Sequence, residues 1–219
     1  MKLLLTSNGF ANKTIVRAFS DIVKKPFKKT SLAFIPTAAN VERDDKSWLV
    51  DDLNRCKKLG FSILDIVDIS AVEKNIWEPR LKQADVLMFG GGNSFHLMYW
   101  LKKSGLSKIL KELLKTRIYV GISAGSMITG KSLTLSQAER LYYEDVGQYK
   151  DEAGLGIVDF LIRPHLNSPH FPNVREAVLK EQAKEISYPI YALDDESAVL
   201  VDNGKEKVVS EGQYLVFNS

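Results

Sequence analysis

A single serine lies between two glycines in the stretch Gly121-Ile122-Ser123-Ala124-Gly125, directly after a hydrophobic run. Residues 118–120 are typical of the end of a buried strand, and residues 126–129 could begin a helix. Small neighbours allow the backbone to turn sharply from strand to helix and leave the serine hydroxyl exposed, which is the geometry of a nucleophile elbow. A structural turn with an incidental serine explains the pattern equally well, so the rest of the chain must decide.

A second turn of small residues lies at positions 90–93, Gly-Gly-Gly-Asn, between an apolar run and a helical pattern. Backbone N–H groups in such a turn can point at an anion. The spacing is not that of a dinucleotide fingerprint and no Lys-Ser or Lys-Thr pair follows, so nucleotide binding is disfavoured against a plain tight turn. A third interpretation joins both motifs, because the N–H groups of Ala124 and of Gly91 or Gly92 could form the oxyanion hole of a hydrolase.

A serine nucleophile needs a base, and the chain has three histidines, His96, His165 and His170. His96 falls inside the helical pattern after the glycines, where a structural role is the default expectation. His165 ends a strand-like run at residues 157–164, whereas His170 lies in a loop. A histidine at a strand end, in a chain with an elbow serine, favours a hydrolase over a structural role.

The composition indicates one α/β domain over residues 1–219. The chain is 45% hydrophobic and 26% charged, and its 30 Lys and Arg against 27 Asp and Glu are dispersed, so nucleic acid is not an expected partner. The apolar run at residues 1–5 is too short for a signal peptide, and no run reaches the roughly 18 residues of a membrane span. Cys56 is the only cysteine, which excludes an intrachain disulfide and favours a cytoplasmic location. No ligand-spaced cluster indicates a metal, and no cofactor is expected.

Apolar runs of strand length alternate with helical patterns along the first part of the chain. Strands are expected at residues 2–6, 31–36, 61–66, 86–90 and 117–121, and helices at 12–23, 47–59, 94–103 and 106–114. This alternation predicts an open, mostly parallel sheet flanked by helices. Residues 196–201 and 205–210 flank Asn203-Gly204, a strong hairpin signal, and 213–217 adds a last strand, so the C-terminal strands form an antiparallel β edge. Sites in such sheets lie at the carboxyl ends of the strands, where the elbow serine falls.

These motifs together resemble the serine peptidases that include dipeptidase E and cyanophycinase. The resemblance rests on Gly-Gly-Gly-Asn-Ser-Phe after a strand, Gly-x-Ser-Ala-Gly and a later Pro-His, and it extends from residues 34–36 to 155–165. It implies that Ser123 is the nucleophile and that His165 is the base. His170 also follows a Pro, but the spacing from the preceding strand makes it the less favoured match.

The resemblance leaves the third member of a catalytic triad open. Relatives similar to cyanophycinase take a carboxylate from a strand near the C-terminus, where this chain offers Asp195 in residues 191–201. Dipeptidase E takes an Asp shortly after the nucleophile helix, where this chain offers only Glu139. Asp195 is therefore preferred over Glu196 and Glu139, and the less favoured alternative is that residues 194–196 form a solvated acidic turn.

The resemblance further implies hydrolysis of small peptides through an acyl-enzyme, including dipeptides with an N-terminal Asp. Asn93, Arg163 and His170 are the candidate substrate-binding residues. Arg163 replaces the Asn that precedes Pro-His in dipeptidase E, and it could meet a substrate carboxylate or point into solvent. The alternatives are an esterase or amidase acting on a non-peptide, and a binding protein that keeps the scaffold without turnover. The oligomeric state, monomer or homodimer, stays open.

Overall fold

The main sheet of the computed structural model, which describes residues 1–145, 147, 149 and 151–219, contains seven strands. They are β1 (Lys2–Thr6), β2 (Ser31–Ile35), β3 (Ile63–Ile66), β4 (Val86–Phe89), β5 (Ile118–Ile122), β8 (Ser197–Asp202) and β9 (Lys205–Ser210), in the order β3-β2-β4-β5-β1-β8-β9. β1 to β5 are parallel, whereas β8 pairs antiparallel with both β1 and β9. The predicted fold class, a mostly parallel sheet with an antiparallel edge, is confirmed.

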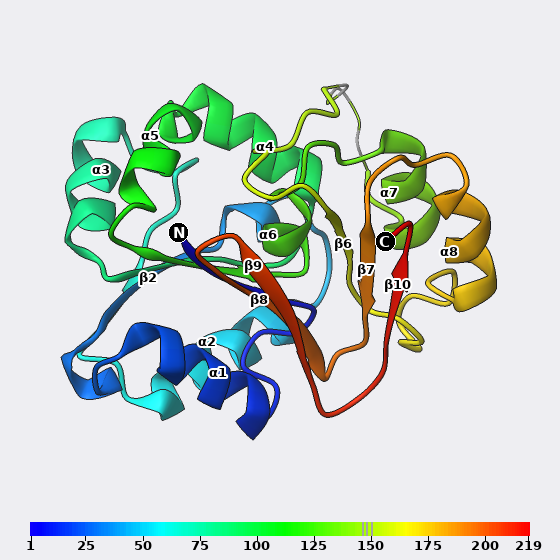
Figure 1. The fold of residues 1–219 in the computed structure, drawn as a ribbon. Coiled ribbons are helices and arrows are strands. Elements are labelled where there is room, and N and C mark those ends of the chain that lie inside the picture. Colours follow the sequence, from blue (N-terminus) through cyan, green and yellow to red (C-terminus); the bar gives the residue numbers. More distant parts are fainter. Residues whose placement is uncertain (146, 148, 150) are drawn as a thin grey trace.

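Helices cover both faces of this sheet (Figure 1). One face carries α1 (Lys13–Val23) and α2 (Ser47–Leu59), and the other carries α3 (Lys74–Gln83), α4 (Ser94–Lys103) and α5 (Leu106–Leu113). Within the described ranges no helix combines the length and apolar character needed to cross a membrane.

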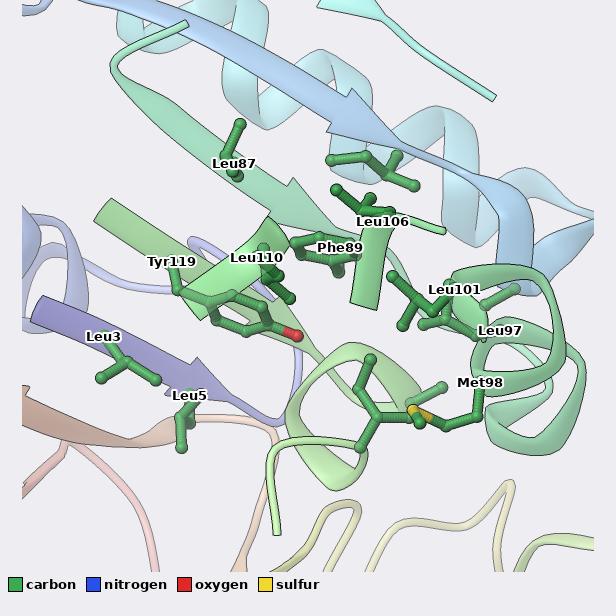
Figure 2. Close-up of a cluster of buried hydrophobic side chains, with 14 of the residues drawn as sticks. Leu3, Leu5, Leu87, Phe89, Leu97, Met98, Leu101, Leu106, Leu110 and Tyr119 are labelled. Atoms are coloured by element: carbon green, nitrogen blue, oxygen red, sulfur yellow. The ribbon is translucent and has the colours of Figure 1, made fainter. Parts of the chain in front are cut away.

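The alternation of side chains along the strands explains why they are apolar throughout. Leu4 belongs to a cluster with Phe19 of α1, whereas its neighbours Leu3 and Leu5 belong to the cluster on the opposite face. Figure 2 shows that second cluster, in which side chains of the strands meet Leu97, Leu101, Leu106 and Leu110 from α4 and α5. Phe89 and Tyr119 stack within it, with ring centroids 4.8 Å apart. Because both faces are buried, the inner parallel strands β1, β2, β4 and β5 are mainly continuous hydrophobic runs, whereas the edge strand β3 is partly exposed and contains Asp65.

A second, three-stranded sheet lies beside the main one. Its strands are β6 (Leu161–Arg163), β7 (Ile190–Leu193) and β10 (Tyr214–Phe217), in the order β10-β7-β6. The helices α7 (Leu135–Tyr142) and α8 (Glu176–Ala183) accompany this sheet (Figure 1). Leu141 of α7 and Leu179 of α8 share a core cluster with Ala192 of β7.

Several expected elements have the predicted bounds, and others differ. The helix expected at 12–23 begins after Asn12, whose side chain caps it by accepting from the Ile15 N–H, and the predicted Asn203-Gly204 turn has positive φ at both residues. The strand expected at 61–66 begins only at Ile63, and the strand-like run 157–164 contains a strand only at Leu161–Arg163. The last strand was expected to extend the main sheet, but β10 pairs with β7 of the second sheet instead. The reason is that the Gln213 N–H donates to the Asp194 carboxylate, which holds the start of β10 beside the end of β7.

The glycines of the elbow are required by close packing of backbone on backbone. After β5 the chain enters the one-turn helix α6 (Ala124–Met127), which packs against β4. A Cβ atom placed on Gly125 would lie 2.7 Å from the carbonyl carbon of Phe89, and one on Gly121 would lie 2.7 Å from that of Gly125. Both separations are far inside van der Waals contact, so neither position accepts a larger side chain without moving the backbone.

We expect Gly125→Ala to lower the free energy of unfolding by about 2–3 kcal/mol, the cost of forcing a methyl group into filled space. Gly91→Ala is the matched control, since a Cβ there would lie 3.5 Å from the Ser123 Cβ, an ordinary contact. The control should change stability by no more than about 0.5 kcal/mol. Urea denaturation of both variants checks this, and equal stabilities would show that α6 does not depend on backbone contact with β4.

Candidate active site

Ser123 lies at the carboxyl end of β5, in the turn that leads into α6. Its backbone has φ 48° and ψ −109°, a strained conformation for a residue with a side chain, and its N–H donates to the Thr6 carbonyl oxygen at 3.0 Å. The turn leaves the side chain partly exposed to a cleft. This is the strained strand-to-helix turn expected of a nucleophile elbow.

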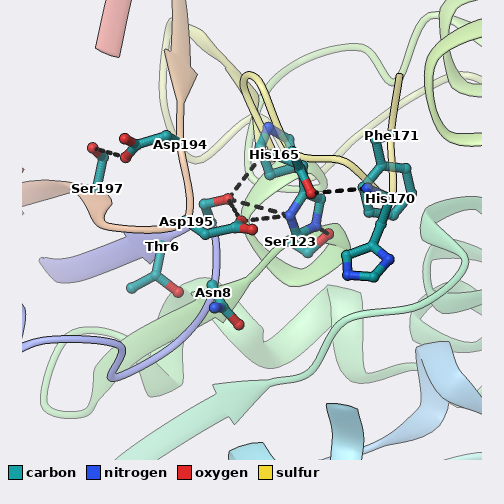
Figure 3. Close-up of polar contacts among 12 residues, drawn as sticks. Thr6, Asn8, Ser123, His165, His170, Phe171, Asp194, Asp195 and Ser197 are labelled. Atoms are coloured by element: carbon teal, nitrogen blue, oxygen red, sulfur yellow. Dashed lines mark hydrogen bonds and ion pairs between the residues drawn. The ribbon is translucent and has the colours of Figure 1, made fainter. Parts of the chain in front are cut away.

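His165 reaches Ser123 from the second sheet. It follows β6 and Pro164, and its backbone also has a positive φ of 65°. Its Nε2 lies 2.9 Å from the Ser123 Oγ, and its ring stacks on Phe171 with centroids 4.5 Å apart (Figure 3). The imidazole is therefore held in one plane by stacking and within hydrogen-bonding distance of the serine hydroxyl.

Asp195 follows β7 and contacts the other side of the imidazole. Its Oδ1 lies 2.7 Å from the His165 Nδ1 (Figure 3). Burial by itself would raise the pKa of Asp195, but the hydrogen bond and positive charge of His165, helped by Ser7, outweigh it and hold that pKa below its ordinary value. The ionised carboxylate accepts the Nδ1 proton, and the other ring nitrogen, Nε2, faces the Ser123 Oγ.

Ser7, which belongs to no recognisable motif in the sequence, completes this hydrogen-bonded group. It follows β1, and its fully buried Oγ lies 2.8 Å from the His165 backbone N and 2.9 Å from the Asp195 Oδ1. The sequence signal for Ser7 is its position, because polar residues 6–8 directly follow the apolar run at residues 3–5 and so lie at the same edge of the sheet as Ser123.

The predicted oxyanion-hole residues lie beside the serine. Gly91 packs close enough that a Cβ on it would touch the Ser123 Cβ, and Ala124 is the first residue of α6. Gly92 has φ 121°, and a Cβ there would collide with the Ala38 carbonyl group. Among the described residues, none accepts a hydrogen bond from the N–H groups of Gly91, Gly92 or Ala124. All three N–H groups are thus unengaged within the described part of the protein.

Two of the three predicted substrate-binding residues do not line the cleft. Asn93 is 1% exposed and caps α4, accepting from the His96 N–H and donating to the Asp145 carbonyl oxygen. Arg163 is 2% exposed and donates to the Thr134 Oγ1 at 2.6 Å, so it points neither into solvent nor into the cleft. Both lie in buried polar contacts because each belongs to the end of a packed helix or strand. His170 does line the cleft.

The two alternative acids also lie away from His165. Glu196 is exposed and accepts from the Asn12 side chain at the start of α1. Glu139 is exposed on α7. Neither residue lines the cleft, and of the three candidate carboxylates the structure brings Asp195 to the imidazole.

The cleft has a volume of about 640 Å³, and most of the charged side chains that line it are acidic. Among the described residues along it, the carboxylates are Glu42, Asp45, Asp51, Asp52, Glu144 and Asp195, against a single arginine, Arg43. Burial raises the pKa of Asp52 to about 7, opposed in part by Arg55. Burial likewise raises the pKa of Glu144 to about 7, although hydrogen bonds from Ser94 oppose it. No set of three or more His, Cys, Asp or Glu in the described chain is arranged to hold a metal ion.

Comparison with known proteins identifies the family of the chain. The sequence profile of peptidase family S51 matches residues 3–209, so the chain belongs to this family and is a serine-type peptidase. It is 28% identical to an uncharacterized peptidase of Listeria monocytogenes over 95% of this chain and 98% of that protein. A Peptidase E of Shewanella oneidensis is 34% identical over 52% of this chain and 46% of its own length. The crystal structure of a putative Peptidase E protein from Listeria monocytogenes superposes with a TM-score of 0.79 and 24% identity, covering 96% of this chain and 98% of that one, which supports the fold.

Glu144 provides a pH-dependent test of burial in the cleft. Its folded-state pKa of about 7 lies above its ordinary value of 4.5. The protonated side chain therefore adds to the free energy of unfolding in full below pH 4.5, and this contribution is lost as the pH rises through about 7. Glu144→Gln removes this dependence. The free energy of unfolding of the variant relative to the parent protein should therefore rise by on the order of 3 kcal/mol between acid and alkaline pH. Urea denaturation of both proteins at pH 5 and pH 8 measures the difference, and an equal difference at both values would contradict the prediction.

Proposed function

We propose that the chain hydrolyses small peptides, with Ser123 as nucleophile, His165 as general base and Asp195 as the orienting acid. The observation that carries this proposal is the continuous hydrogen-bonded chain from Asp195 Oδ1 through the imidazole to Ser123 Oγ, with separations of 2.7 and 2.9 Å. These distances are within the reach expected of a serine and its base. Membership of peptidase family S51 supports the same reaction class.

The mechanism follows from which nitrogen carries the proton. With Nδ1–H bonded to Asp195, the Nε2 of His165 takes the proton of Ser123 as Oγ attacks the amide carbonyl. The N–H groups of Ala124 and of Gly91 or Gly92 receive the developing negative charge on the carbonyl oxygen. The protonated imidazole then gives its proton to the leaving amine, and an activated water repeats the sequence on the acyl-enzyme.

The first test addresses the nucleophile and the acid together. Ser123→Ala should abolish hydrolysis of a dipeptide library and labelling by a fluorophosphonate probe. Asp195→Asn should retain the fold but lower turnover by on the order of 10⁴, because the imidazole then loses the partner that sets its tautomer. Glu139→Gln, which changes an exposed residue on α7, should be mild by comparison.

The reverse ranking of Asp195→Asn and Glu139→Gln, at matched thermal stability, would move the acid to the segment after the nucleophile helix. A folded protein that binds peptides but neither hydrolyses them nor accepts the probe or a smaller sulfonyl fluoride would be a binding protein on this scaffold.

The charge of the cleft supports a substrate with a positive group rather than an N-terminal Asp. Glu42, Asp45 and Asp51 line the cleft against Arg43, whereas burial leaves Asp52 and Glu144 partly protonated near neutral pH and Asp195 is paired with His165. Arg163, the candidate partner for an acidic substrate, lies outside the cleft. Negative walls attract a free α-ammonium group or a basic side chain and repel a substrate carboxylate. We therefore extend the proposal to peptides with a free amino terminus and a basic or neutral first residue.

Peptides that differ only in their first residue test this selectivity. Those beginning with Lys should have a kcat/KM at least about tenfold above those beginning with Asp, from the charge of the walls. Asp51→Asn, which removes one wall carboxylate, should reduce that ratio by about two- to fivefold, the range of an exposed ion pair. Asp21→Asn on α1, away from the cleft, makes the same change in net charge and should leave the ratio unaltered. A preference for Asp in the parent protein would contradict the proposal.

A further inference from the structure

We propose that Ser7 is a positioning residue that fixes the Asp195 carboxylate relative to the His165 imidazole for the reaction. The inference rests on the proposed function, since it concerns the residues given catalytic roles there. Ser7 is fully buried at the end of β1, and its hydroxyl contacts both Asp195 and His165.

Three polar atoms lie around the Ser7 hydroxyl, and together they set its direction. The His165 Nδ1, 3.5 Å away, carries the proton that it donates to Asp195 and so cannot accept from Ser7. The His165 backbone N lies 2.8 Å away and can only donate, so Ser7 Oγ accepts there. The single hydroxyl proton is then directed to the ionised Asp195 Oδ1 at 2.9 Å, which can only accept. Because the partners leave one arrangement, the hydroxyl joins the backbone of the base to the carboxylate that orients its ring.

This contact matters because Asp195 is otherwise only partly enclosed. Its side chain is 35% exposed, whereas that of His165 is 14% exposed, so water can compete for the carboxylate. The same oxygen, Oδ1, accepts from both Ser7 Oγ and His165 Nδ1. The buried Ser7 hydroxyl, directly after β1, thus fixes the position of the Asp195 Oδ1 that accepts from the imidazole.

The position of β1 makes Ser7 suitable for this role. The strand lies between β5, which ends at Ser123, and β8, which begins just after Asp195. The Ser7 N–H donates to the Ser197 carbonyl oxygen at 3.2 Å, so its backbone is tied to the segment that carries Asp195. The hydroxyl also engages the N–H of a residue with a φ of 65°, a conformation that surrounding contacts must maintain.

A double-mutant cycle separates positioning from a general structural role. Ser7→Ala should lower kcat on the order of ten- to a hundredfold with little change in KM, the effect of losing one hydrogen bond to a charged group on a rate. In the Asp195→Asn background the same substitution should change kcat much less, because the imidazole is already misoriented. Ser7→Thr keeps the hydroxyl and should restore most of the turnover.

The matched control is Ser31→Ala. It removes another serine-to-carboxylate hydrogen bond, from Ser31 to Asp85, at the amino ends of the parallel strands and so away from the cleft. It should leave kcat unchanged in both backgrounds. If Ser7→Ala does not fold, Ser7→Cys replaces it, since a thiol of similar shape is a weak donor. An equal loss of kcat in both backgrounds, or full activity of Ser7→Ala beside an inactive Ser123→Ala, would overturn the role of Ser7 alone. Retained hydrolysis by Ser123→Ala would instead overturn the proposed function.

Discussion

The hydrogen bond between His165 Nε2 and Ser123 Oγ joins two sheets, and the geometry of the site depends on it. Ser123 follows a strand of the main sheet, and His165 follows a strand of the smaller one. Each side chain is presented by a residue with positive φ at the end of a buried strand. The strain is tolerated because both turns are anchored, Ser123 by the Thr6 carbonyl and His165 by Ser7.

The cleft places many carboxylates where water is partly excluded. Burial favours the protonated form of Asp52 and Glu144 and raises both pKa values to about 7. Asp195 is the contrasting case, because donors from His165 and Ser7 keep its pKa below the ordinary value. The same chemical group therefore behaves differently a short distance apart, according to whether donors compensate its desolvation.

The backbone packing around Ser123 links catalytic geometry to stability. α6 lies so close to β4 that Gly125 is needed for space, and so close to the end of β5 that Gly121 is needed, whereas Gly91 has room for a methyl group. The glycines of Gly-x-Ser-x-Gly thus have two structural effects. They permit the sharp turn, and they let the helix approach the neighbouring strand. Tyr119 adds to this contact, because its buried hydroxyl donates to the Gly125 carbonyl oxygen at 2.5 Å.

Local patterns were sufficient to predict the main sheet, most of its helices and the positions of Ser123 and the Asn203-Gly204 turn, because periodicity and turn chemistry act between near neighbours. They did not indicate α3, α7 or α8, nor the pairing of β10 with β7. The environments of Asn93 and Arg163 were also decided by packing, since burial depends on which segments cover a residue. The sequence by itself determined the fold class, the family and the candidate serine and histidine. Only the tertiary structure brought Asp195 and Ser7 into contact with His165 and assembled the cleft around them, because these arrangements depend on contacts between residues far apart along the chain.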